Sequence, residues 1–264
     1  MSLEHLWMRR VPSDNPLVCT KGEVIGVSAN FSAYVIRSDG KVLSKIDYKS
    51  RLGRPCIGQK LLAFPSKDAI FLFELSKGKP AGIIPTKAGL HETCAFDKSE
   101  SLYTSVENIL LKLERTPEGK YKIVQKKVLI GNILSIDYNK KLVVGTTEGL
   151  YIGKKFLNIG RVNHVKVGPY IASSIPYGFA LYDFNGKEIL EIDDVEVSGI
   201  VWLGDLIAIG DRSRKRILII DTSGNVVREL KFTGSVRSFD WDVILVVAHR
   251  KKVHAYLLTP TKHQ

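Results

Sequence analysis

Three cysteines come first among the residues that could do chemistry, because a thiol can bind a soft metal, form a disulfide or act as a nucleophile. They are Cys19, Cys56 and Cys94, and the two intervals between them are nearly equal. None belongs to a C-x-x-C pair or to a cysteine–histidine cluster with the spacing of zinc ligands. We therefore expect reduced thiols that fill small spaces in a core, and no thiol-based site.

Histidine and carboxylate side chains could provide acid–base catalysis or bind a metal. The candidates are the neighbours His91 and Glu92, together with His164, which act jointly only if the fold brings them to one place. Histidines so far apart in sequence are usually surface or packed groups. The chain also contains no G-x-S-x-G, H-E-x-x-H, phosphate-loop or EF-hand pattern. We predict no catalytic residue, no metal site and no cofactor.

Three basic clusters could bind an anionic partner. They lie within 211–216, 249–252 and 48–54. Lysine and arginine can neutralise phosphates of a nucleic acid or pair with carboxylates of a protein. The predicted partner-binding residues are Arg212, Arg214, Lys215, Arg216, Arg250, Lys251, Lys252, Lys49, Arg51 and Arg54.

The composition is that of a basic protein with a large core. The 264 residues include 39 Lys and Arg against 27 Asp and Glu, a net charge of +12 that attracts polyanions at low salt. No apolar run approaches the roughly 20 residues of a membrane span, and the first residues lack an apolar signal segment. We expect a cytoplasmic protein without membrane association. Abundant Lys, Ile and Val with few Gln and Met resemble thermophile composition.

Short strands are the elements that must position these residues. Apolar or alternating runs separated by turns recur, and no stretch has a sustained helical period. The order is clearest in the four strands a, b, c and d at 197–205, 206–210, 217–225 and 226–232. It recurs in 162–192 and 236–258, and earlier units begin near Pro16, Pro55, Glu92 and Ile133. An interval of roughly 30 to 41 residues is typical of propeller blades.

Two features recur at fixed places in these units. The turn after strand c carries a glycine before a lysine or asparagine, which indicates a hairpin that needs positive φ. These glycines are Gly40, Gly78, Gly119, Gly186 and Gly224. An aromatic ring also stands near the end of strand a, and we expect these rings to pack between neighbouring units. They are Phe96, Tyr138, Trp202 and Trp241.

This repeat pattern resembles the β-propeller superfamily and is nearest in blade size to WD-repeat propellers. The typical Gly-His and Trp-Asp signatures are absent, since Trp241-Asp242 falls at the end of a strand a. The resemblance implies one all-β domain over 1–264, a seven-bladed β-propeller, with six blades as the alternative because the fourth unit is short. The last unit lacks strand d, so we expect residues 6–11 to complete it and close the ring.

In such a ring, the b–c turns and the d–a connections emerge at one face, so the basic clusters share that face. We expect an arc of cations without interleaved acids, and binding of an acidic partner would relieve the repulsion between these cations. The predicted function is a non-catalytic scaffold in a cytoplasmic assembly that docks an acidic protein partner. Alternatives are nucleic-acid binding through phosphates at the same face, and a hydrolase or lyase at the channel mouth.

Overall fold

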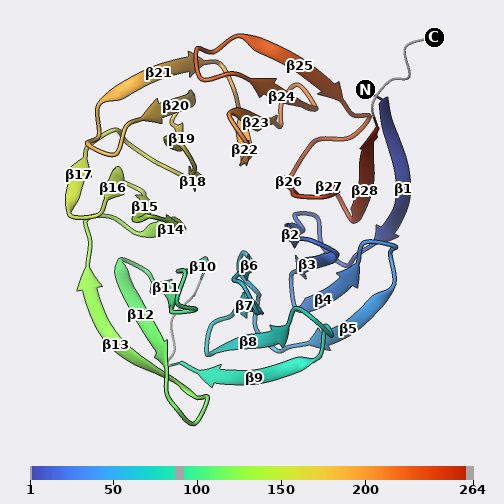
Figure 1. Ribbon diagram of the computed structural model, residues 1–264, viewed down its shortest axis with the longest axis vertical. Coiled ribbons are helices and arrows are strands. Elements are labelled where there is room, and N and C mark those ends of the chain that lie inside the picture. Colours follow the sequence, from blue (N-terminus) through green and yellow to red (C-terminus); the bar gives the residue numbers. More distant parts are fainter. Residues whose placement is uncertain (1, 87–91, 260–264) are drawn as a thin grey trace.

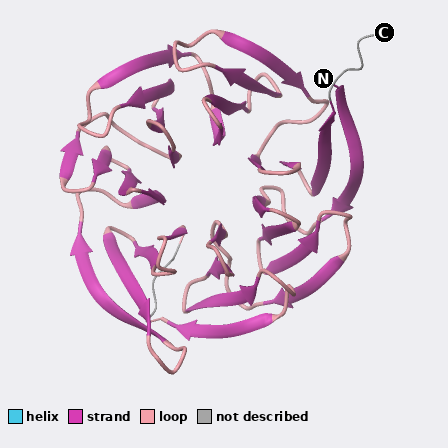
Figure 2. Ribbon diagram, viewed as in Figure 1, coloured by secondary structure: helices cyan, strands magenta, loops and turns pink. Residues whose placement is uncertain are grey.

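The computed structural model describes residues 2–86 and 92–259. Strands form seven four-stranded antiparallel sheets that stand as blades around a central axis (Figure 1). The described residues contain strands and loops without a helix (Figure 2), so none of their elements is a helix able to cross a membrane. The prediction of an all-β, seven-bladed propeller is confirmed, and the six-bladed alternative is wrong.

Each blade runs from an inner strand a beside the axis, through b and c, to an outer strand d. The strands of blade 1 are β2 (Leu17–Lys21), β3 (Val24–Ala29), β4 (Ser32–Arg37) and β5 (Val42–Asp47). Those of blade 2 are β6 (Cys56–Ile57), β7 (Leu61–Pro65), β8 (Ala69–Glu74) and β9 (Pro80–Pro85). Those of blade 3 are β10 (Cys94–Phe96), β11 (Leu102–Val106), β12 (Ile109–Arg115) and β13 (Tyr121–Val128).

The next three blades follow the same order. The strands of blade 4 are β14 (Ile133–Asn139), β15 (Lys141–Thr146), β16 (Leu150–Ile152) and β17 (Lys155–Leu157). Those of blade 5 are β18 (Val165–Val167), β19 (Ile171–Ile175), β20 (Gly178–Tyr182) and β21 (Glu188–Asp193). Those of blade 6 are β22 (Val197–Leu203), β23 (Leu206–Asp211), β24 (Arg216–Ile220) and β25 (Val226–Lys231).

Blade 7 joins the two ends of the chain. Its strands are β26 (Ser238–Trp241), β27 (Leu245–His249), β28 (Lys252–Thr259) and, as the outer strand, β1 (Ser2–Arg10). β1 pairs antiparallel with β28, from Ser2 opposite Thr259 to Arg10 opposite Lys252. The predicted closure by the N-terminal segment is therefore confirmed. This ladder replaces two frayed ends with backbone hydrogen bonds.

The hydrophobic core lies between the blades. Seven clusters of buried apolar side chains each combine residues from two neighbouring blades. The recurring aromatics pack there as predicted: Phe96, Trp202 and Trp241 join such clusters, and Tyr138 stacks on Tyr103 of blade 3 with ring centres 5.8 Å apart. Removing this surface from water is the main stabilisation of the ring.

The predicted glycine turns and the short fourth blade are also confirmed. All five glycines after strand c have φ between 63° and 88°. In blade 4 the outer strand β17 has 3 residues, whereas the outer strand β13 of blade 3 has 8. The outer wall of the ring is therefore interrupted beside blade 3.

Candidate functional site

The basic face is formed by the b–c turns and d–a connections, which alternate antiparallel strands place at one end of every blade. Arg212–Lys215 connects β23 to β24 in blade 6, and Arg250–Lys251 connects β27 to β28 in blade 7. Lys49 and Arg51 lie in the connection from β5 to β6. The structure thus brings the first two clusters onto adjacent blades and places the third further round the same face.

Acidic side chains are interleaved with these cations, so the expectation of an arc without acids is wrong. The reason is that loops distant in sequence bring carboxylates to the same turns. The ion pairs are Arg212–Glu196 at 3.6 Å, Arg214–Asp194, Arg216–Glu229 at 3.1 Å, Arg250–Asp14 at 2.9 Å, Lys251–Asp14 at 3.9 Å and Lys49–Asp68 at 3.1 Å. The hydrogen bond from Arg250 holds the pKa of Asp14 below its usual value.

Asp211 anchors the blade 6 turn from within. Its side chain is fully buried and accepts hydrogen bonds from Arg216 Nε at 3.0 Å and Ser213 Oγ at 2.9 Å. Burial alone would raise the pKa of Asp211, but these hydrogen bonds and the charge of Arg216 leave it below its usual value. An ionised, buried carboxylate therefore fixes the shape of this turn.

Three predicted residues remain exposed and open to a partner. Within residues 2–86 and 92–259, Arg51, Lys215 and Lys252 form no ion pair. Lys215 and Lys251 also have φ values of 55° and 58°, in the left-handed region that few lysines occupy. Lys215 ends the b–c turn of blade 6, Lys252 begins β28, and Arg51 lies in the connection from β5 to β6, so all three are exposed at this face.

A groove between the outer parts of blades 6 and 7 adjoins the basic face. Its cavity of about 440 Å³ is lined by Lys231, Arg250 and Lys252 and by the rings of Phe232, His249, His254 and Tyr256. Burial and the neighbouring His249 lower the pKa of His254 to about 4, so that ring is neutral at pH 7. The groove therefore combines neutral aromatic surface with cations.

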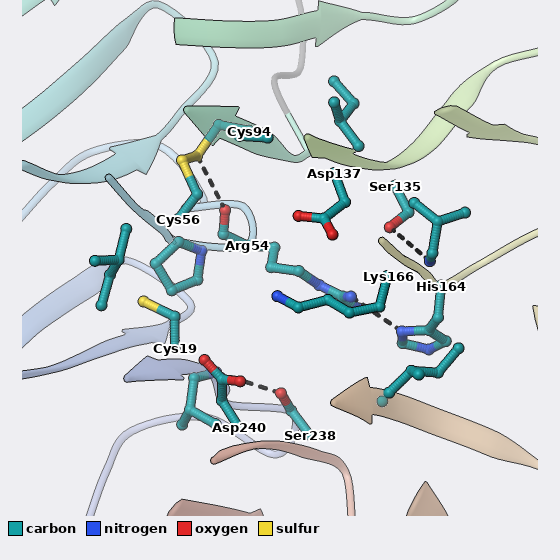
Figure 3. Close-up of a pocket in the computed structure, with 18 of the residues that line it drawn as sticks. Cys19, Arg54, Cys56, Cys94, Ser135, Asp137, His164, Lys166, Ser238 and Asp240 are labelled. Atoms are coloured by element: carbon teal, nitrogen blue, oxygen red, sulfur yellow. Dashed lines mark hydrogen bonds between the residues drawn. A yellow bond between two sulfur atoms is a disulfide. The ribbon is translucent and has the colours of Figure 1, made fainter. Parts of the chain in front are cut away.

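Arg54 does not lie on the basic face with the other nine residues. Its guanidinium enters the central channel and donates a hydrogen bond to His164 Nδ1 at 3.0 Å (Figure 3). The chain turns inward there, because Arg54 precedes the inner strand β6 by only two residues. Including Arg54 in the arc was therefore wrong.

The channel holds a cavity of about 200 Å³ lined by five charged residues, which are Lys21, Arg54, Asp137, Lys166 and Asp240. Arg54 and Lys166 extend into it, with Asp137 and Asp240 on either side (Figure 3). The charge of Asp137 raises the pKa of Lys166, whereas burial raises the pKa of Asp240. Burial and the nearby guanidinium hold the pKa of His164 well below its usual value, so its ring is neutral and accepts from Arg54.

Two inner strands, β14 and β26, each carry a Ser-x-Asp pair that accepts hydrogen bonds from the inner strand of the next blade. Ser135 Oγ accepts from Val165 N at 3.2 Å, and Asp137 Oδ2 accepts from Val167 N at 2.7 Å. Blade 7 repeats the arrangement: Ser238 accepts from Val18 N at 3.3 Å and Asp240 from Thr20 N at 2.8 Å. The channel carboxylates are therefore occupied in holding blades together.

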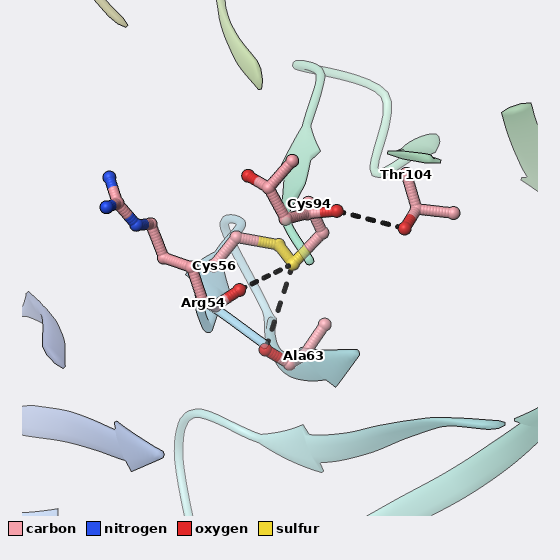
Figure 4. Close-up of a disulfide and its surroundings, with 6 residues drawn as sticks. Arg54, Cys56, Ala63, Cys94 and Thr104 are labelled. Atoms are coloured by element: carbon pink, nitrogen blue, oxygen red, sulfur yellow. Dashed lines mark hydrogen bonds between the residues drawn. A yellow bond between two sulfur atoms is a disulfide. The ribbon is translucent and has the colours of Figure 1, made fainter. Parts of the chain in front are cut away.

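The cysteines form a disulfide, so the expectation of three reduced thiols is wrong. Cys56 and Cys94 are bonded across the interface of blades 2 and 3, with Cα atoms 5.6 Å apart, a normal separation (Figure 4). Cys19 is free and buried, and burial raises its thiol pKa well above the usual value. A protonated, buried thiol is a poor nucleophile.

The candidate acid–base residues His91, Glu92 and His164 do not form a site among the described residues. Glu92 is exposed, His164 is buried in the channel, and His91 lies outside the described residues. In the part of the chain that the structure describes, no three His, Cys, Asp or Glu side chains are placed to hold a metal.

The sequence interpretation missed Asp211 and the aromatic groove. Asp211 stands next to Arg212, so a basic turn that begins with an acid was a usable signal. His254 and Tyr256 alternate along one strand, which puts both on the same side of blade 7. Their meeting with Phe232 of the preceding connection depends on blade packing, which the sequence pattern does not specify.

No protein-family model matches this chain, and no curated protein matches it in sequence. Solved structures do share its fold. A chain in the crystal structure of the mitotic checkpoint complex has a TM-score of 0.82 at 11% identity, covering 97% of this chain and 92% of that one. The Neurospora crassa Pan2 WD40 domain has a TM-score of 0.79 at 12% identity, covering 99% and 97%. The predicted resemblance to WD-repeat propellers is confirmed for the fold.

Proposed function

We propose that this WD-repeat-like propeller is a non-catalytic scaffold that docks an acidic protein partner through its basic face. The observation that carries the proposal is that adjacent blades 6 and 7 present Lys215 and Lys252 exposed at this face, without an ion pair among the described residues. Two unpaired cations on neighbouring blades offer binding positions for carboxylates of a partner.

The ion pairs of the face are exchangeable. Arg250 and Asp14 are 70% and 51% exposed, and ion pairs in contact with water contribute little to stability. Carboxylates of a partner can therefore replace Asp14 or Asp194 at little cost. The turn keeps its shape meanwhile, because Asp211 holds Arg216 from inside. A rigid surface loses little conformational entropy when it binds.

A protein partner is also supported by one of the structural neighbours, which was solved as part of a complex. The scaffold is proposed to belong to a cytoplasmic assembly. Disulfides are rare in cytosolic proteins of mesophiles but occur in those of hyperthermophiles. The Cys56–Cys94 bond and the thermophile-like composition are consistent with such a host.

The test is a variant with six cations of the face changed to serine. The changes are Arg212→Ser, Arg214→Ser, Lys215→Ser, Arg250→Ser, Lys251→Ser and Lys252→Ser. A matched control changes six exposed lysines elsewhere: Lys41→Ser, Lys77→Ser, Lys79→Ser, Lys98→Ser, Lys122→Ser and Lys187→Ser. Affinity capture from the native host, after nuclease treatment, should recover the partner with the wild type and control but not with the first variant. Equal recovery by both variants, with unchanged melting temperatures, would refute the proposal.

Single-stranded nucleic acid is a second candidate ligand, favoured by the aromatic groove between blades 6 and 7. A base can stack on the half-buried rings of Phe232 and Tyr256 while lysines contact phosphates, and each stacked base contributes about 1–3 kcal/mol. Under this alternative, Phe232→Ala would weaken binding of a labelled oligonucleotide, and affinity would fall steeply with salt. Nuclease treatment would also remove whatever the wild type captures, which separates this candidate from a protein partner.

A further inference from the structure

The flank of blade 3 is left uncovered by the short outer strand of blade 4. In Figure 1, β13 forms a long arc, whereas its neighbour β17 is short. Large apolar side chains are exposed on β13 and in the turn after it: Ile123 is 42%, Val124 42%, Val128 70% and Ile130 56% exposed. Ile123 and Val128 pair with Leu113 and Ile109, which face blade 2, so they lie on the other side of β13 from blade 4.

A groove lies between blades 3 and 4 at this place. Its cavity of about 450 Å³ falls within the usual size of ligand sites. Apolar groups form its walls: Leu110 and Leu129 from the side of blade 3, and Leu142, Val144 and Tyr151 from blade 4. Such walls suit the apolar side chain of a bound peptide.

Lysines also line this groove. Lys112, Lys127 and Lys154 line the groove, and no Asp or Glu does so among the described residues. Lys112 is paired with Glu114 at 2.5 Å. Lys127 lies over the ring of Tyr151, with its ammonium 5.5 Å from the ring centre. Neither Lys127 nor Lys154 has an ion pair within the described ranges.

We propose that this groove binds an acidic peptide segment of a partner protein, with a large apolar side chain inserted between blades 3 and 4. A purely apolar ligand would bring Lys127 and Lys154 out of water without a counter-charge, and a basic one would be repelled. An acidic segment with an apolar anchor satisfies both the walls and the lysines. This site is separate from the basic face, because it shares none of that face's residues and lies on other blades.

The test uses a short fluorescent peptide of alternating Asp and Leu residues, at physiological salt. Two control peptides replace Asp by Lys or Leu by Ser. Fluorescence anisotropy with the wild type should give an affinity at least about tenfold higher for the Asp–Leu peptide than for either control. A preference for acid without a preference for Leu would show that the apolar walls take no part, and would overturn the proposal.

Variants separate the groove from the overall charge of +12. Lys127→Glu with Lys154→Glu should weaken binding at least about tenfold, whereas Lys77→Glu with Lys79→Glu, which makes the same charge change on blade 2, should change it less than about twofold. Equal losses in the two pairs would overturn the proposal.

The six-serine variant of the basic face distinguishes the two proposals. It should keep Asp–Leu peptide binding within about threefold of the wild type even where it fails to capture a partner. Conversely, loss of groove binding in the Lys127→Glu, Lys154→Glu variant should leave capture at the basic face intact. Leu142→Ala, checked for its melting temperature, should weaken binding of the Asp–Leu peptide but not of the Asp–Ser peptide.

Discussion

Removing the Cys56–Cys94 disulfide should cost this propeller a large part of its stability. The bond joins inner strands of neighbouring blades and closes a loop of 38 residues. In the chain-entropy model, releasing such a loop returns about 13 cal/mol/K to the unfolded chain, or about 4 kcal/mol at 25 °C. For a domain of this size, that loss lowers the melting temperature by roughly 8 °C or more.

The assay compares denaturant unfolding of the wild type and of a Cys56→Ala, Cys94→Ala variant, each with and without dithiothreitol. Reductant should destabilise the wild type by about 4 kcal/mol and leave the variant unchanged. Cys19→Ala is the matched control: it removes the free thiol, so it should respond to reductant as the wild type does. Alkylation under denaturing conditions should label one cysteine before reduction and three after it.

Two results would show that the disulfide does not stabilise the fold in this way. Alkylation of all three cysteines without reductant would mean that the bond does not form. A wild type with the bond intact, whose unfolding free energy did not respond to reductant, would mean that the unfolded chain gains no freedom when it is released.

Three further changes test other parts of the fold. Asp211→Asn should destabilise the protein by about 2 kcal/mol at pH 7, because Arg216 loses its charged, buried acceptor and keeps only the pair with Glu229. Because the folded pKa of Asp211 is lowered, its ionised form stabilises the fold above the unfolded pKa of about 4, and this stabilisation is lost on acidification. The variant should therefore lose less stability than the wild type below pH 4 in urea titrations; parallel profiles would contradict this. Ser238→Ala should cost about 1 kcal/mol, because Val18 N loses its acceptor, and an unchanged unfolding midpoint would contradict the blade clamp. Deleting residues 2–10 should abolish cooperative thermal unfolding, because blade 7 loses its outer strand; a deletion variant that unfolds like the wild type would contradict closure by β1.

Much of the fold could be predicted because each blade repeats the same local signals. Glycine turns such as that at Gly224 and rings such as Trp202 recur at fixed places, so one well-defined blade sets the register for the others. The missing last strand and the spare N-terminal segment then implied closure by β1.

The disulfide could not be predicted from spacing, because it depends on which side of each inner strand a cysteine faces. Alternate residues of a strand point to opposite sides, so a shift of one residue reverses the direction. Cys56 and Cys94 both pack between blades 2 and 3, whereas Cys19 packs between blades 1 and 2. Cys19 and Cys56 therefore face the following blade, whereas Cys94 faces the preceding one. The nearly equal spacing of the three cysteines does not reveal this difference.

The cations of the basic face could be predicted, but the acids that pair with them could not, for a similar reason. The cations are concentrated in short turns that a sequence pattern reveals. Their partners come from elsewhere: Asp14 reaches Arg250 across 236 residues of sequence, and only because the ring closes. Arg54 was misplaced because its cluster straddles the point where the chain turns from the face into the channel.

Cross-linking mass spectrometry of the native complex shows whether the basic face binds an acidic protein. The nuclease-treated native complex would be treated with a reagent that joins lysine to carboxylate side chains. We predict cross-links from Lys215, Lys251 and Lys252 to Asp or Glu residues of one partner protein. Cross-links confined to lysines on other faces, or a complex that falls apart after nuclease treatment, would contradict the account.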